Sequence, residues 1–193
     1  MPAARRRFIA RLVPAGQFAI LAGPQRKTSK MPEEFTKYGS LKVRPGVTEI
    51  RVARTFPHSV ERVWQALVEP ELLAEWLAPG TIDPREGGRI RLEFADSGIV
   101  IDSDVAEFDA PHAVAYSWSN AGEPHRPLRF ETKAEGDGTL LTLTLQLPSG
   151  EDAARMAAGF EAHLEMLAAA LDGTPIAFPF ATFMAMRAVY QVD

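Results

Sequence analysis

Histidine is the side chain in this sequence best suited to chemistry, because it binds metals and transfers protons near neutral pH. The chain has four, and no two stand at the spacing that places metal ligands on one helix face: His58, His112, His125 and His163. It has no cysteine and no P-loop, G-x-G-x-x-G, H-E-x-x-H or G-x-S-x-G pattern. We therefore expect no metal and no cofactor, and we assign no catalytic residue.

His163 has the most informative surroundings of the four. It falls in a helix predicted from about residue 151 to 171, inside the apolar stripe that faces the rest of the domain, whereas Glu161 and Glu165 point away from that stripe. The stripe consists of Met156, Phe160, Leu164, Leu167 and Leu171. Two interpretations follow: a core histidine bonded to a backbone carbonyl or a sheet carboxylate, or a polar anchor inside a ligand cavity.

Asp102 and Asp104 share one face of a predicted strand, where two carboxylates could form an acid–base pair. The same spacing is typical of the solvated face of a sheet. Arg91, Arg129 and Glu131 also occupy polar alternates, and cross-strand ion pairs at ~0.2–1 kcal/mol each explain such residues without catalysis. We interpret the two aspartates as part of this solvated face.

Aromatic residues form the remaining group of interest. Trp64 lies on a fully apolar helix stripe and is predicted to be core. Trp76 ends a short helix and Trp118 ends a strand, at the rim where a cavity would open, so packing and cavity lining stay open for both. Phe94 and Phe130 lie on the apolar faces of predicted strands.

Composition places the chain among ordinary globular proteins. Its 193 residues are 46% hydrophobic and 24% charged, which fits one domain with extensions. The net charge of −4 argues against nucleic acid as a partner. No apolar run reaches the ~20 residues of a membrane span. The absence of cysteine fits a reducing compartment, so we expect a cytoplasmic protein.

The first 46 residues differ from the rest of the chain. Residues 1–30 contain seven basic residues and no acidic one, with an apolar stretch that Arg11, Pro14 and Gln17 interrupt. A signal peptide or transit peptide fits this pattern less well than a disordered extension, or an upstream extension with translation beginning near Met31. We expect residues 1–46 to be such an extension and the folded domain to span residues 47–173.

Periodicity predicts the elements of that domain. Alternating residues indicate strands over 47–56, 89–94, 99–108, 113–119, 128–133 and 139–147. Two short helices are expected, one after a Ser59 cap and one from Pro70, and the long helix closes the domain. Residues 174–193 are too apolar for a free tail, so we expect them to dock on the domain or on a partner subunit, as in a homodimer.

This order predicts an α+β fold of the helix-grip type, a curved antiparallel sheet wrapped around a long C-terminal helix. The chain resembles the START-like (SRPBCC) superfamily, and within it the family named after the activator of the heat-shock-protein-90 ATPase. The resemblance covers about residues 47–173. It rests on RTF at 54–56, VERVWQAL at 60–67, EPELL at 69–73, REGG at 85–88, EFDAP at 107–111, YSW at 116–118, GTLLTL at 138–143 and GFEAHL at 159–164. Phe160 stands where the family pattern usually has tryptophan.

The resemblance implies binding of a small, largely apolar molecule in a cavity between the long helix and the sheet. The residues expected to line it are Leu92, Phe94, Trp76, Trp118, Phe130, Met156, Phe160 and His163. Two alternatives stay open: regulation of a heat-shock chaperone ATPase through a protein surface, and a cyclase- or hydrolase-type enzyme using the same cavity. A binding protein is favoured over an enzyme because no nucleophile, metal site or acid–base pair is evident.

Overall fold

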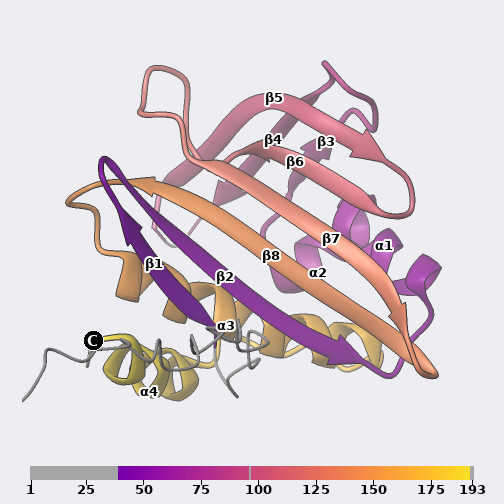
Figure 1. Cartoon of the computed structure of the whole chain (residues 1–193). Helices are drawn as coiled ribbons and strands as arrows, with labels where there is room; N and C mark the ends of the chain where they lie inside the picture. The colour runs from indigo at the N-terminus through magenta and orange to yellow at the C-terminus, as the bar shows by residue number, and fades with distance from the viewer. Residues whose placement is uncertain (1–38, 96, 192–193) are drawn as a thin grey trace, which may run out of the picture. The chain divides into compact units, whose positions relative to one another are not determined.

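The computed structural model describes residues 39–95 and 97–191. Most of the basic extension, residues 1–38, lies outside the described residues. The described chain folds into eight strands and four helices (Figure 1). The strands are β1 (Ser40–Arg44), β2 (Val47–Phe56), β3 (Gly80–Ile82), β4 (Arg89–Phe94), β5 (Ile99–Asp109), β6 (Ala113–Ser117), β7 (Pro127–Glu135) and β8 (Gly138–Pro148). The helices are α1 (Val60–Val68), α2 (Pro70–Trp76), α3 (Ala153–Leu171) and α4 (Phe180–Tyr190).

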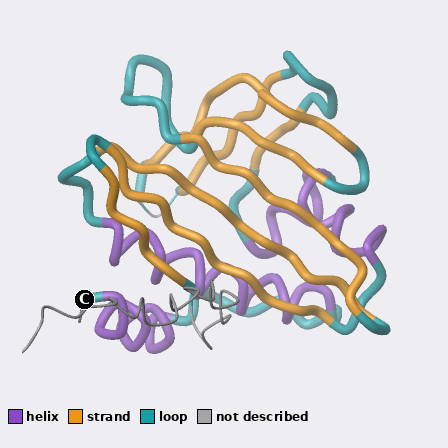
Figure 2. Tube along the Cα trace, viewed as in Figure 1, coloured by secondary structure: helices purple, strands orange, loops and turns teal. Residues whose placement is uncertain are grey.

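All eight strands form one antiparallel sheet in the order β1-β2-β8-β7-β6-β5-β4-β3. The register shifts between Val105 and Glu107 of β5, so this strand carries an extra residue opposite β6, an irregularity that bends a strand. Figures 1 and 2 show the curved sheet with α1, α2 and α3 on one of its faces. The helix-grip prediction is therefore confirmed.

Local sequence signals account for the helix ends. The Ser59 hydroxyl accepts a hydrogen bond from the Arg62 backbone N–H at 3.3 Å, which caps α1. Pro70 occupies the first turn of α2, where its missing N–H costs nothing. Gly173 follows α3 with a φ of 73°, a left-handed conformation that glycine adopts without strain.

The core lies between the inner face of the sheet and the helices. Alternate residues of each strand point inward, so β8 alone contributes four fully buried leucines: Leu141, Leu143, Leu145 and Leu147. The side chains of Phe160 and Leu164 on α3 are buried against this face. The apolar stripe predicted for the long helix is therefore the face that forms the core.

Two strands were absent from the sequence prediction. β1 pairs with β2 along its whole length, so the sheet begins at residue 40, ahead of the expected domain start at 47. Its side chains are mostly exposed, Val43 to 81%, so no buried alternation marks it. β3 has three residues, too few for a period to be visible.

The C-terminal tail forms α4, which lies beside α3 (Figure 1). The Thr182 hydroxyl donates to Glu165 of α3 at 2.7 Å, and Arg187 forms an ion pair with Asp152 at the start of α3 at 3.1 Å. Several apolar side chains of this region remain exposed, among them Phe178, Phe180 and Met184. None of the helices formed by the described residues is long and apolar enough to cross a membrane.

Candidate functional site

The imidazole of His163 is fixed by one hydrogen bond. Its Nδ1 atom lies 2.8 Å from the backbone carbonyl oxygen of Trp76, at the end of α2. A carbonyl oxygen can only accept, so Nδ1 carries the proton and donates it. In the neutral ring, Nε2 is then unprotonated and can only accept.

The surroundings of His163 favour this neutral ring. Burial lowers its pKa below the usual histidine value, and the hydrogen bond to Trp76 opposes that shift. The ring is not fully enclosed, because the residue is only partly buried. Nε2 has no hydrogen-bond partner among residues 39–95 and 97–191. The site therefore holds a fixed acceptor to which no group of the described residues donates.

The His163 ring belongs to a group of aromatic rings that come from separate segments of the chain. The His163 ring makes edge contacts with Phe94 of β4, at 6.1 Å between centroids, and with Phe178, at 5.4 Å. Phe94 contacts Trp118 at 5.7 Å, and Trp118 contacts Phe160 of α3 at 5.1 Å. We call these five residues the His163 cluster. Apart from one histidine, it consists of aromatic hydrocarbon and one indole.

Of the other residues predicted to line a cavity, three are fully buried in the core and Met156 is partly buried against it. Trp76 is 0% exposed, its indole N–H donates to the Ala66 carbonyl at 2.8 Å, and its ring packs edge-on against Phe130 at 6.1 Å. Leu92 and Phe130 are fully buried, and Met156 is partly buried against the same core. The structure thus brings Phe94, Trp118, Phe160 and His163 together in one cluster. It places the remaining four in the packing around that cluster.

Phe178 is the member of the cluster that sequence reasoning missed. It lies between α3 and α4 in a segment without helix or strand, and it is 41% exposed. The sequence signal was the apolar character of the tail, which predicted docking without indicating where. Only the path of the chain after Gly173 places this ring on His163.

Asp102 and Asp104 lie on the outer face of the sheet, away from the His163 cluster. Arg89 reaches both carboxylates, at 2.7 Å and 3.2 Å, and Arg91 reaches Asp102 at 3.1 Å. Asp104 pairs with Arg89 and Asp102 with Arg91 in the register of β4 and β5. The interpretation of these residues as a solvated, ion-paired face is confirmed.

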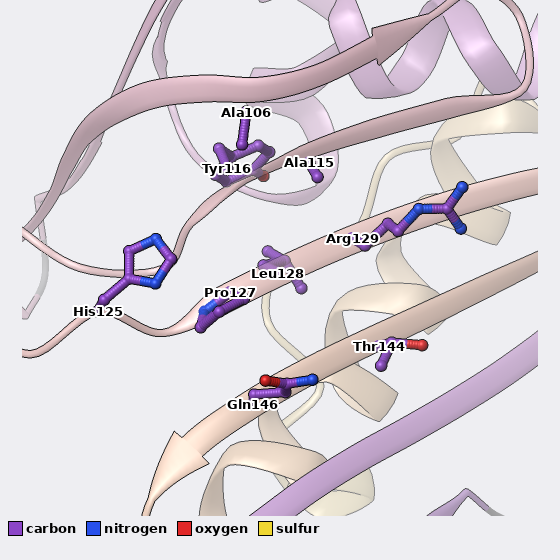
Figure 3. A pocket seen from close by; sticks show the side chains of 9 residues that line it. All are labelled: Ala106, Ala115, Tyr116, His125, Pro127, Leu128, Arg129, Thr144 and Gln146. Atoms are coloured by element: carbon purple, nitrogen blue, oxygen red, sulfur yellow. The ribbon is translucent and has the colours of Figure 1, made fainter. Parts of the chain in front are cut away.

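A hollow of about 250 Å³ lies on this outer face and contains none of the residues predicted to line a cavity (Figure 3). Its lining consists of Ala106, Ala115, Tyr116, His125, Pro127, Leu128, Arg129, Thr144 and Gln146. Glu107 holds Arg129 through two hydrogen bonds, of 2.7 Å and 3.1 Å, and Glu131 forms a third. The guanidinium is therefore neutralised and has little attraction left for an anion. Among the described residues, no three histidine or acidic side chains form a group that could hold a metal ion.

A known protein family and several solved structures resemble this chain. The sequence model of the family described as activator of Hsp90 ATPase homolog 1-like protein matches residues 57–172. None of the curated proteins matches the chain.

Solved structures share the fold. CalU16 from Micromonospora echinospora is 23% identical with a TM-score of 0.66, covering 79% of this chain and 96% of its own. The protein encoded by BPP1335 from Bordetella parapertussis is 28% identical with a TM-score of 0.62, covering 75% and 85%. DynU16, from the dynemicin biosynthetic locus, is 26% identical with a TM-score of 0.61, covering 66% of this chain and 48% of its own.

Proposed function

Since the chain belongs to the activator of Hsp90 ATPase homolog 1-like family, within the START-like (SRPBCC) superfamily, we propose that it binds a small, largely apolar molecule between α3 and the sheet. The observation that carries this proposal is the His163 cluster. Phe94 of β4 and Phe178 of the α3–α4 segment contact the His163 ring, and Trp118 continues this aromatic wall from Phe94 to Phe160 of α3. Within the described residues, no donor reaches Nε2 of that ring. Small-molecule sites generally combine apolar and aromatic walls with a few placed polar groups.

Entry of a ligand requires one of these rings to move, and Phe178 is the ring best suited to do so. It is 41% exposed and its segment belongs to no helix or strand. An edge-to-face ring contact contributes only ~0.5–1.5 kcal/mol, so a ligand that buries comparable apolar area can replace it. We therefore place the entrance at Phe178.

Binding is favoured over catalysis for a chemical reason. His163 is the one titratable side chain of the cluster, and an acid–base reaction needs a second group of matched pKa within reach. The name of DynU16, which refers to a biosynthetic locus, connects a structural neighbour to small-molecule chemistry and supports a small-molecule ligand here. The cytoplasmic location and the homodimer remain predictions of the sequence.

Nuclear magnetic resonance of the full-length protein tests this proposal, because its three tryptophans give three indole N–H signals. The probe is 2-methoxynaphthalene, an uncharged apolar molecule. Binding at the His163 cluster shifts the Trp118 signal in a saturable way and leaves the Trp64 signal in place, because Trp64 packs elsewhere, against Phe108 at 5.4 Å. Absence of a saturable Trp118 shift both with this probe and with its hydroxyl and carboxylate analogues, 2-naphthol and 2-naphthoate, contradicts the proposal.

The outer hollow provides the matched control. His125→Leu replaces an exposed histidine of that hollow and leaves the His163 cluster intact. The variant should bind the probe as the wild type does. Weaker binding by this variant, with no change on mutation of Trp118 to Phe, would place the ligand on the other face of the sheet.

A further inference from the structure

Resting on the binding site proposed above, we infer that the ligand is an uncharged apolar molecule carrying one hydroxyl or N–H group, which it donates to Nε2 of His163. The inference starts from the fixed tautomer. The Trp76 carbonyl commits Nδ1 as the donor, so the nitrogen left for a ligand is an acceptor.

The described part of the chain supplies no competing donor to this acceptor. No side chain or backbone group among residues 39–95 and 97–191 donates a hydrogen bond to Nε2. An apolar molecule without a donor would cover this nitrogen and leave it without a partner, at the cost of desolvating it. A hydroxyl or N–H group satisfies it. The site therefore discriminates between molecules of the same shape by the presence of a donor.

The cluster also selects against negative charge. Burial lowers the pKa of His163 and the hydrogen bond to the Trp76 carbonyl opposes that shift, so the ring that faces a ligand is the neutral one. The four other members of the cluster are aromatic residues, which carry no charge. A carboxylate would face a lone pair and lose its hydration without gaining a cation. The expected ligand is accordingly a neutral apolar molecule that carries a phenol-like or alcohol hydroxyl or an N–H group.

Three probes of one shape separate these properties: 2-naphthol with a donor, 2-methoxynaphthalene without one, and 2-naphthoate with a negative charge. Their affinities for the full-length protein are measured by isothermal titration calorimetry at about pH 7.5, above the usual histidine pKa. We expect 2-naphthol to bind about tenfold more tightly than 2-methoxynaphthalene, the effect of one satisfied hydrogen bond. We expect 2-naphthoate to bind most weakly.

His163→Leu should abolish the preference, bringing 2-naphthol to the affinity of 2-methoxynaphthalene, while His125→Leu should retain it. Equal affinities in the wild type, a preference that survives His163→Leu, or tightest binding of 2-naphthoate would overturn this inference and leave the binding site standing. Failure of all three probes to bind would overturn the proposed function itself. The two failures are therefore distinguishable.

A measurement on the unmutated protein keeps the test independent of how His163→Leu folds. Long-range proton–nitrogen spectra report which ring nitrogen of His163 carries the proton. We expect a protonated Nδ1 and an unprotonated Nε2, and we expect the Nε2 signal to respond differently to 2-naphthol, which donates to this nitrogen, than to 2-methoxynaphthalene, which only covers it. A protonated Nε2 in the free protein, or the same response to both probes, would overturn the inference.

Discussion

Glu161 and His163 lie two residues apart on α3, yet their polar atoms are used in opposite ways. Glu161 is 5% exposed and both of its oxygens are bonded. One oxygen lies 3.0 Å from the Arg54 guanidinium, and the other accepts from the Tyr190 hydroxyl at 2.7 Å and from the Gly39 N–H at 3.3 Å. His163 is partly exposed and uses one of its two nitrogens.

The difference shows which polar group serves the fold and which is available to a ligand. A buried charge with every partner in place offers a ligand nothing and holds its neighbours in position. The neighbours of Glu161 come from β2, from the residue before β1 and from α4. Glu161 therefore ties the end of α4 to α3, to β2 and to the start of the described chain.

The largest expected effect comes from removing the carboxylate of Glu161, whose two oxygens are both hydrogen-bonded. Glu161→Ala leaves the Tyr190 hydroxyl and the partly exposed Arg54 guanidinium without their acceptor, so we expect the free energy of unfolding to fall by about 2–4 kcal/mol. Urea denaturation measures this loss. Glu165→Ala is the control on the same helix, since its carboxylate accepts one hydrogen bond, from Thr182, and should cost under about 1 kcal/mol. Equal losses in the two variants would remove the contrast between Glu161 and an ordinary helix carboxylate.

A smaller effect is expected from removing the Tyr190 hydroxyl, which donates to Glu161. Tyr190→Phe removes one hydroxyl that donates to a charged oxygen and should lower the free energy of unfolding by about 1–2 kcal/mol. Burial and the nearby Glu161 raise the pKa of Tyr190, so the phenol stays a neutral donor over the ordinary pH range. Urea denaturation of Tyr190→Phe in the wild-type and Glu161→Ala backgrounds isolates the pair. Full additivity would show that the hydroxyl and the carboxylate do not act together.

The two residues also show how far sequence reasoning reaches. Helical periodicity identified the face of α3 that meets the sheet and placed His163 on it, and the expected hydrogen bond to a backbone carbonyl is present. The role of His163 as a ligand anchor stays a proposal. The same periodicity placed Glu161 outside, because it marks only one buried face. A second face is covered by α4 and by Gly39, and those contacts join residues more than twenty positions apart.

The strands also differ in how clearly the sequence predicts them. Strands with one wet face alternate clearly, so β2 and β4 were predicted with the bounds that the structure shows. β1 is mostly exposed and β3 is very short, so neither produces a period. Phe94, Trp118 and Phe160 could be assigned to inward faces from their strands and helix. Their arrangement around His163 depends on the curvature of the sheet and on the path of the tail, which no local pattern encodes.

The smallest expected effect is a change of stability with pH, and it concerns His163. Burial lowers the pKa of His163 in the folded protein, so the unfolded chain takes up a proton first as the pH falls. The contribution of the neutral ring is fully present above the unfolded value of about 6.5, and it is lost as the pH falls through the lower folded value. Relative to the wild type, His163→Leu should therefore gain stability between about pH 7.5 and pH 5.5, because leucine has no proton to bind.

Urea denaturation of the wild type and His163→Leu at both pH values measures this change. His58 and Asp172, 2.9 Å apart, are present in both proteins, so their contribution cancels in the difference. A difference that stays constant with pH would show that the His163 ring is as accessible to protons in the folded as in the unfolded chain. The contrast with Glu161 would then lie in hydrogen bonding alone, and the acceptor at Nε2 would be lost whenever the ring is protonated near neutral pH.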